Sequence, residues 1–202
     1  MSSTPAAALS VVIPTYNERG RLAELVEQTF QVFADAALDG ELVVVDDNSP
    51  DGTGDLADEL ALRFRVKVVH RAGKLGLGTA VVEGFAAASS DVMGVMDADL
   101  SHPPELLVRM LRAIRDEGAD FAVGSRYVPG GGTTHWELSR RLMSRLACLL
   151  ARPVTPVRDA TSGFFLVRRQ IAEAARIQAG GFKICLELLV RSDARALVEV
   201  PY

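Results

Sequence analysis

The feature that most constrains this chain is an alternation of short apolar runs, rich in β-branched residues, with longer segments of helical spacing. Strands are expected at 9–13, 42–45, 66–69, 92–96 and 121–123. Helices are expected between them, at 21–38, 51–64, 76–89 and 103–117. Such a series is typical of an α/β fold with a mostly parallel central sheet and helices on both faces.

The pattern becomes less regular after Arg126. A glycine-rich loop precedes an arginine-bearing amphipathic helix at 138–150, and the rest predicts a strand at 163–167, a helix at 182–195 and a strand at 197–200. Residues 1–8 are small and unpatterned, which predicts a disordered leader before a single domain over 9–202. The chain stops directly after an expected strand without a polar tail, which indicates truncation at the C-terminus.

Composition excludes several classes of protein. The 202 residues are 49% apolar and 24% charged, which excludes wholesale disorder, and the net charge of −4 argues against a nucleic-acid partner. No apolar run reaches the ~18 residues of a membrane span, and the N-terminus lacks the pattern of a secretory signal. Cys148 and Cys185 match no disulfide or zinc pattern, so we expect reduced thiols in a cytosolic protein.

Polar side chains follow four of the expected strands at the point where each strand ends. These segments are 14–18, 46–53, 97–99 and 124–127. In open parallel sheets, ligands bind beyond the carboxyl ends of the strands. The sequence therefore predicts a binding site at this edge.

Asp97 and Asp99 are the strongest candidates for metal ligands. Their i, i+2 spacing on an extended segment places both carboxylates on one side. Hard oxygen ligands suit Mg²⁺ or Mn²⁺, with substrate phosphates completing the coordination. A lone Asp-x-Asp triplet is usually helix capping or surface charge, but this one directly follows a buried strand, which favours a metal site.

The second acidic cluster and the glycine loop after it remain open to two interpretations each. Ser49 or Asp51 is expected to cap the next helix, whereas Asp46 or Asp47 would bind a base or ribose. The loop at 73–79 resembles a phosphate loop but lacks the Gly-Lys-Ser/Thr ending. It would either pack the next helix tightly or close a nucleotide pocket.

A basic group lies after the fifth strand and on the helix 138–150. Arg140 and Ser144 share a helix face, and arginine binds phosphate in a bidentate manner, although a solvated helix face would look the same. The leucines of this helix would lie on a bilayer surface or pack on the sheet. The basic group comprises Arg126, Arg140, Arg141 and Arg145, and the histidines expected to be structural or exposed are His70, His102 and His135.

Taken in order, the motifs resemble family 2 glycosyltransferases, and within them the dolichol-phosphate (polyprenol-phosphate) mannosyltransferases. The resemblance runs from about residue 9 to 202. The motifs are VVIPTYNE at 11–18, VVDDNSPDGT at 44–53, KLGLGT at 74–79, MDADLSHPPE at 96–105 and GSRY at 124–127.

The resemblance implies a GT-A fold and inverting transfer of mannose from GDP-mannose to a polyprenyl (dolichyl) phosphate, with Mg²⁺ or Mn²⁺ held by Asp97 and Asp99. Peripheral contact with a membrane, at its cytoplasmic face, is also implied. The implied nucleotide-sugar site comprises Pro14, Tyr16, Glu18, Val45, Asp47, Asp97, Ala98, Asp99 and Arg126. The implied catalytic residues are Asp99, Arg126, Arg140 and Ser144, with Trp136 in the acceptor loop.

Two departures from the family pattern and three alternatives accompany this interpretation. Ser101 stands where some relatives have a glutamine near the metal, and Phe165 stands where relatives often have an arginine, which would alter the pocket wall. A polyprenyl-phosphate glucosyltransferase using UDP-glucose shares the fold, and a non-catalytic nucleotide-sugar-binding subunit shares the pocket. The absence of G-x-G-x-x-G after the first strand counts against a dehydrogenase.

Overall fold

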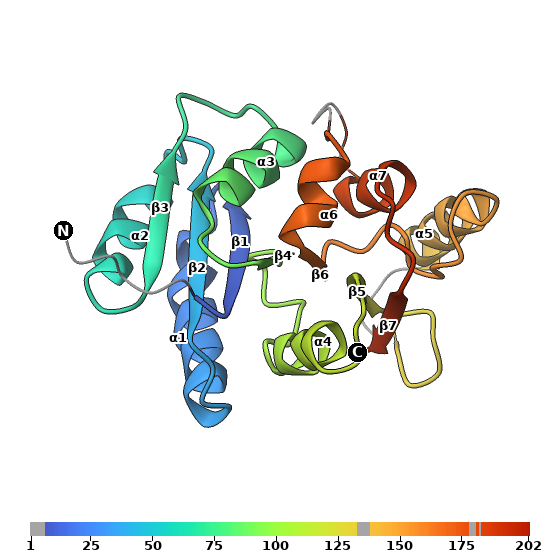
Figure 1. Cartoon of the computed structure of the whole chain (residues 1–202). Helices are drawn as coiled ribbons and strands as arrows, with labels where there is room; N and C mark the ends of the chain where they lie inside the picture. The colour runs from blue at the N-terminus through green and yellow to red at the C-terminus, as the bar shows by residue number, and fades with distance from the viewer. Residues whose placement is uncertain (1–6, 133–137, 178–180, 182) are drawn as a thin grey trace.

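A seven-stranded mixed sheet forms the middle layer of the molecule in the computed structural model (Figure 1). The structure describes residues 7–132, 138–177, 181 and 183–202, without the side chains of 138, 140 and 141. The strands are β1 (Leu9–Thr15), β2 (Gly40–Asp46), β3 (Val66–His70), β4 (Val92–Val95), β5 (Phe121–Ser125), β6 (Phe165–Arg168) and β7 (Leu197–Pro201).

The order of the strands across the sheet is β3-β2-β1-β4-β6-β5-β7. Neighbouring strands are parallel except for β6, which pairs antiparallel with β4 on one side and with β5 on the other. Because β6 reverses the direction between them, β4 and β5 run the same way. The carboxyl ends of β1, β2, β4 and β5 therefore lie at the same edge of the sheet, and the predicted mostly parallel α/β fold is confirmed.

Helices cover both faces of this sheet (Figure 1). Helices α1, α2 and α4 pack on one face, and α3, α6 and α7 pack on the other. Helix α5 lies at the end of the molecule beyond β5 and β7, and its last residue, Ala151, joins the core beneath α3, α6 and α7. The helices are α1 (Arg19–Asp35), α2 (Thr53–Ala61), α3 (Leu77–Ala87), α4 (Glu105–Arg115), α5 (Leu138–Ala151), α6 (Arg169–Ala174) and α7 (Ile184–Arg191).

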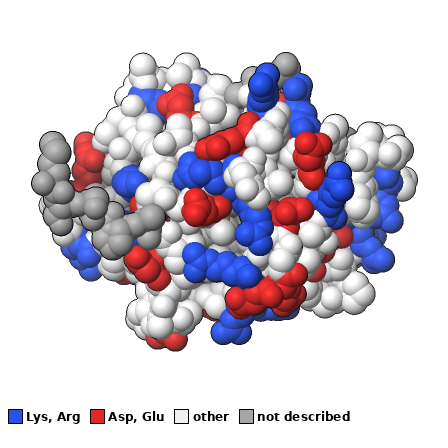
Figure 2. All heavy atoms as spheres, viewed as in Figure 1, with Lys and Arg blue, Asp and Glu red and all other residues white. Residues whose placement is uncertain are grey.

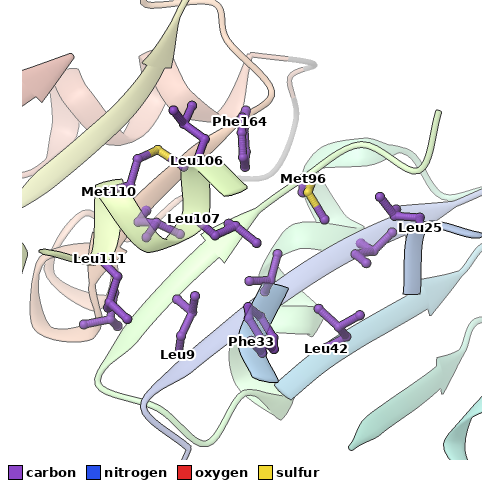
Figure 3. Packing of buried hydrophobic residues seen from close by; sticks show 14 of the residues in the cluster. Leu9, Leu25, Phe33, Leu42, Met96, Leu106, Leu107, Met110, Leu111 and Phe164 are labelled. Carbon is purple, nitrogen blue, oxygen red and sulfur yellow. The ribbon is translucent and has the colours of Figure 1, made fainter. Parts of the chain in front are cut away.

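The strands are apolar along their length because each central strand is buried on both faces. In β1, Val11 and Ile13 join the core beneath α1 and α4, whereas Val12 joins the core beneath α3. Phe33 and Leu107 fill the first of these cores (Figure 3). Phe165 stacks on Phe121 in the second core at 5.2 Å, so the expectation that it alters a pocket wall is wrong.

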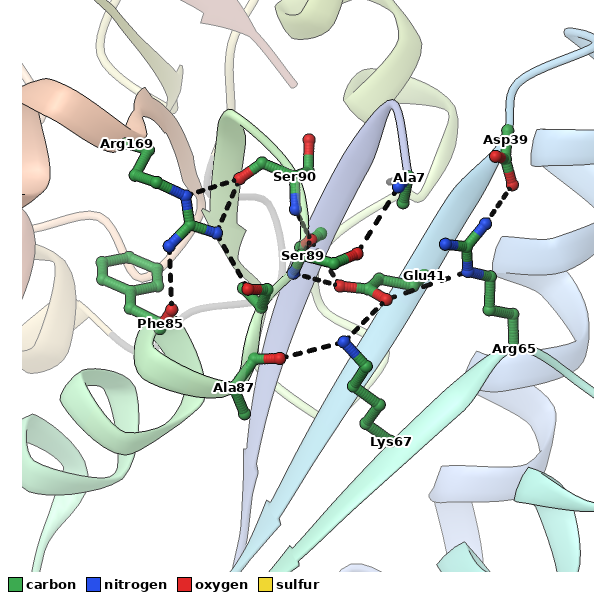
Figure 4. Close-up of polar contacts among 12 residues, drawn as sticks. Ala7, Asp39, Glu41, Arg65, Lys67, Phe85, Ala87, Ser89, Ser90 and Arg169 are labelled. Carbon is green, nitrogen blue, oxygen red and sulfur yellow. Dashed lines mark hydrogen bonds and ion pairs between the residues drawn. The ribbon is translucent and has the colours of Figure 1, made fainter. Parts of the chain in front are cut away.

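At the edge of the sheet where β1, β2 and β3 begin, a buried carboxylate joins the strands (Figure 4). Glu41 accepts hydrogen bonds from the hydroxyl of Ser10 at 2.7 Å and the backbone N–H of Ser89 at 2.6 Å, and its other oxygen lies 3.2 Å from Lys67 Nζ. Burial alone would raise the pKa of Glu41, but the hydrogen bonds from Ser10 and Ser89 outweigh it and lower the pKa. This network is structural.

Four observations bear on the remaining expectations. The short helix α6 was not expected, and its first residue, Arg169, donates to the carbonyl oxygens of Ala88 and Ser90. Ala7, placed in the expected leader, is buried, while residues 1–6 lie outside the described part. Cys148 and Cys185 are buried and free. In the described part of the chain, the helices are all too short or too polar to cross a membrane.

Candidate functional site

The polar segments predicted at the strand ends come together at one edge of the sheet. Thr15 at the end of β1 is in register with Asp46 at the end of β2, and Val12 is in register with Val95 near the end of β4. Asp97 follows β4 by two residues, and Arg126 directly follows β5. One continuous edge thus carries both the acidic and the basic candidates.

Three carboxylates form the acidic centre of the site. Burial, reinforced by the charge of Asp99, raises the pKa of Asp97 to about 6. Burial also acts on Asp99, but the hydrogen bonds from Ser101, including its backbone N–H at 3.0 Å, outweigh it and lower the pKa. Ser101 therefore orients Asp99. Partial burial raises the pKa of Glu18, because burial outweighs the charge of Arg21, which would lower it.

The room beside Asp97 exists because residue 163 is glycine. A Cβ built on Gly163 would lie 2.7 Å from Asp97 Oδ2 and 3.1 Å from Oδ1, which is too close for a real contact. Both Asp97 oxygens thus face a residue without a side chain, and carboxylate oxygens are the ligands that a small divalent cation prefers. The described residues provide no complete cluster of three His, Cys, Asp or Glu, so further ligands would come from substrate oxygens.

His102 fixes the backbone of this acidic segment. Its Nδ1 accepts a hydrogen bond from the Asp97 N–H at 3.2 Å, and its ring stacks on Phe164 with centroids 4.8 Å apart. Burial lowers the pKa of His102 to about 4, so the ring is neutral near pH 7. The expectation of a structural histidine is confirmed here. His70 is exposed and lies 3.1 Å from Asp58, and His135 lies outside the described residues.

The two acidic residues after β2 have separate surroundings. Asp46 accepts hydrogen bonds from the Thr15 hydroxyl at 3.1 Å and from Ser49, through both its N–H and its hydroxyl. Those contacts hold Asp46 within the protein, and the binding of a nucleoside by Asp47 stays a prediction. Asp51 receives the Thr53 N–H at 3.0 Å just before α2, although no side chain caps the helix itself.

Sequence reasoning missed the residue that positions Asp47. The buried guanidinium of Arg71 bonds to Asp47 Oδ1 and to the hydroxyl of Thr79, and the Gly76 N–H donates to Asp47 Oδ2 at 3.2 Å. The loop 73–79 therefore contacts both Arg71 and Asp47 in addition to opening α3. A signal was present, because Arg71 directly follows β3.

The remaining predicted nucleotide-binding residues occupy three kinds of position. Tyr16 is 38% exposed, with Lys74 Nζ 3.9 Å from the centre of its ring. Pro14 is half-buried at the end of β1. The side chains of Val45 and Ala98 lie in the two cores, so any contact with a ligand falls to their backbone.

Arg126 directly follows β5, and a partner that the sequence did not reveal holds its side chain. Its Nε and Nη2 each donate to a carboxylate oxygen of Asp159 at 2.7 Å, and its backbone N–H donates to Asp159 at 3.0 Å. Burial disfavours the charge, but the bonds to Asp159 outweigh it and raise the pKa of Arg126. Asp159 lies 33 residues farther along the chain, and no local pattern marks it.

The other basic candidates are placed only in part. Ser144 lies half-buried on α5. Arg140 is in the same helix, but its side chain is outside the described residues, as are Trp136 and the side chain of Arg141. Their predicted contact with an acceptor phosphate stays a prediction.

Comparison with known sequences gives consistent matches. The sequence model of Glycosyl transferase family 2 matches residues 10–176. A dolichol-phosphate mannosyltransferase from Pyrococcus furiosus is 44% identical over 96% of this chain and 55% of its own length. A polyprenol monophosphomannose synthase from Mycolicibacterium smegmatis is 41% identical over 98% and 77%, respectively. This chain thus spans about half of the first relative and about three quarters of the second.

Solved structures show the same fold. A mannosyltransferase from Pyrobaculum calidifontis, solved with GDP-Man and Mn²⁺, has a TM-score of 0.72 at 17% identity, covering 98% of this chain and 56% of that one. Glucosyl-3-phosphoglycerate synthase from Mycobacterium tuberculosis, solved with Mn²⁺, UDP-glucose and phosphoglyceric acid, has a TM-score of 0.70 at 23% identity, covering 96% and 70%. At these identities the likeness concerns the fold.

Proposed function

Because this chain belongs to glycosyl transferase family 2, we propose that it transfers mannose from GDP-mannose to a polyprenyl phosphate, giving polyprenyl-phosphate mannose with inversion at the anomeric carbon. The names of its relatives at 37–44% identity support this choice of sugar and acceptor. The observation that carries the proposal is the placement of the Asp97–Asp99 pair and Arg126 at one edge of the sheet. Both phosphates are anionic, so the donor diphosphate needs the cation that the two aspartates would hold, and the acceptor phosphate needs the arginine.

The acidic centre serves the donor diphosphate. Asp97 and Asp99 would hold Mg²⁺ or Mn²⁺, which supplies positive charge to the leaving diphosphate. His102 and Ser101 fix the two aspartates, and Gly163 leaves the space that the ligand needs. Such preorganisation is worth more than flexible contacts because the groups need no rearrangement during the reaction.

The nucleoside end of the donor lies toward β1, β2 and the loop 73–79. Asp47, held by Arg71 and the Gly76 N–H, presents a fixed carboxylate to a base or ribose. The half-exposed ring of Tyr16 offers an apolar surface beside it, currently covered by Lys74. We expect the Lys74 ammonium to leave the ring when a nucleotide binds.

Arg126 serves the acceptor. A phosphate monoester is already anionic near neutral pH, so the transfer requires no general base. One of its oxygens forms the new bond to C1 of mannose, while the bond from C1 to the GDP oxygen breaks and GDP leaves with the electron pair. The protein must offset the repulsion between two anionic phosphates, and Arg126, with Arg140 and Ser144, would do so at the acceptor.

A membrane surface is the proposed source of the acceptor. Helix α5 buries Cys148 and Ala151, but it leaves its large apolar side chains uncovered: Leu142, Met143, Leu146, Leu149 and Leu150 are all exposed. An ordinary helix packed on the sheet would bury them, so the exposure supports the interpretation of α5 as a helix that lies on a bilayer. In this proposal the site faces the membrane from its cytoplasmic side.

The test is transfer of labelled sugar to a short polyprenyl phosphate with Mn²⁺ or Mg²⁺, with GDP-mannose and UDP-glucose run side by side. We expect lipid-linked mannose, lost in Asp99→Asn and retained in the matched control Asp116→Asn, an exposed residue at the end of α4. Transfer from UDP-glucose alone would change the donor. Nucleotide binding without transfer from either donor would favour the non-catalytic subunit and refute the proposal.

A further inference from the structure

An open cavity of about 600 Å³ lies beside the proposed acceptor arginine, between the segment after β5 and helix α5. Its charged lining consists of Arg126, Arg145, Arg152 and Arg158, and no described aspartate or glutamate contributes to the wall. A cavity lined in this way attracts anions.

The charge of this cavity is only partly neutralised. Asp159 pairs with Arg126, whereas no ion pair joins Arg145, Arg152 or Arg158 to a carboxylate within the described residues. Arg145 lies 5.8 Å from the ring centre of Tyr127, and Arg152 donates to the carbonyl oxygen of Pro156 at 2.9 Å. Three arginines therefore face one cavity without an acidic partner.

The cavity adjoins the exposed apolar face of α5. This face, here called the α5 patch, comprises Leu142, Met143, Leu146, Leu149 and Leu150, of which Leu149 also lines the cavity. At the end of the molecule where α5 lies, the visible surface is white and blue, and the red surface is farther toward the middle (Figure 2). Because Leu149 belongs to both, the apolar patch and the arginine cavity adjoin.

We propose that the α5 patch and the arginine cavity dock together on an anionic bilayer, with the leucines at the acyl boundary and Arg145, Arg152 and Arg158 on headgroup phosphates. Charge complementarity selects this occupant, because Arg145, Arg152 and Arg158 have no acidic partner among the described residues and lie beside the exposed side chains of the α5 patch. The inference rests on the proposed membrane contact and adds its lipid class. Arginine suits this task because it binds phosphate in a bidentate manner.

Vesicle co-sedimentation tests the lipid class. The intact protein is mixed with vesicles of phosphatidylcholine alone or with phosphatidylcholine containing phosphatidylglycerol. We expect the parent protein to bind the anionic vesicles far more strongly than the neutral ones. Each arginine removed should lower the affinity for anionic vesicles about fivefold, so Arg152→Gln/Arg158→Gln should lower it about 25-fold. The matched control is Arg109→Gln/Arg112→Gln, which removes the same charge from the exposed surface of α4 and should change binding less than twofold.

Equal binding to both kinds of vesicle, or an unchanged Arg152→Gln/Arg158→Gln variant, would overturn the inference. A calorimetric titration would also overturn it if inorganic phosphate bound the cavity while the affinity for vesicles did not depend on the arginines. The cavity would then be a site for a small anion. Transfer to a short acceptor in detergent separates the two proposals. If the Arg152→Gln/Arg158→Gln variant still transfers sugar in detergent but no longer binds vesicles, the docking role is supported. If the parent protein itself shows no transfer in detergent, only the catalytic proposal is refuted.

Discussion

Glu41 and Asp97 lie at opposite edges of the sheet, and the protein shifts their pKa values in opposite directions. Glu41, at the edge where the strands begin, receives enough hydrogen bonds to lower its pKa in spite of burial. Asp97, at the edge where the strands end, has burial and a second carboxylate beside it, and its pKa rises to about 6. The hydrogen-bonded carboxylate of Glu41 stabilises the fold, whereas the carboxylate of Asp97, whose charge has less compensation, is available to bind a cation.

Removing the under-neutralised charge should affect chemistry most. We expect Asp97→Asn to reduce sugar transfer by about 10²–10³-fold, the scale at which one preorganised electrostatic group acts. Thermal stability should stay level or rise, because the substitution removes repulsion with Asp99. Steady-state kinetics and thermal unfolding check this. A stability loss that matches the loss of activity would contradict the comparison.

Filling the space beside Asp97 should weaken the site without removing a ligand. Gly163→Ala places a methyl group on the Asp97 oxygens, and the carboxylate is expected to rotate away. Apparent Mn²⁺ affinity should drop about 10–100-fold, the usual effect of disturbing groups that orient a ligand. Titration calorimetry with Mn²⁺ and GDP measures it. Gly20→Ala is the control, because no atom lies within 4 Å of the added Cβ, and equal affinity in both variants would refute the role.

At the opposite edge, a substitution should affect stability alone. Glu41→Gln replaces an acceptor of two hydrogen bonds and the partner of Lys67, and we expect about 1–3 kcal/mol of destabilisation. Urea unfolding measures the loss. The kcat of the folded variant should equal that of the parent protein, and a large change in kcat would show that the two edges are coupled.

Acidification should act on the two edges with opposite signs. As the pH drops through about 6, Asp97 takes up a proton in the folded protein while it is still ionised in the unfolded chain, so its protonation favours folding and releases metal. Mn²⁺ affinity should decline by up to about tenfold per pH unit below 6. Glu41 has a lowered pKa, so its stabilisation is lost only at still lower pH. Metal titrations at pH 5 and 7 check this, and equal affinities would contradict it.

Local pattern was enough to predict most of the architecture. Buried strands and the helices that follow them can be recognised from the spacing of their apolar residues. The expected strand at 42–45, for example, lies within β2, which extends from Gly40 to Asp46. The position of Asp97 and Asp99 follows from the same pattern, because a strand that ends in carboxylates places them at the edge. The short helix α6 was missed because its six residues make fewer than two turns, too few for a helical spacing of apolar residues to be recognised.

The sequence by itself determined the alternation of strands and helices and the chemistry at each strand end. Both depend on residues that are close together in the chain, so the local pattern is enough to predict them. Only the tertiary structure decided that β6 enters antiparallel between β4 and β5, and which partner holds each functional side chain. Arg71 holds Asp47 and Asp159 holds Arg126 across 24 and 33 residues. Such pairings depend on how distant elements pack, and no local periodicity encodes that.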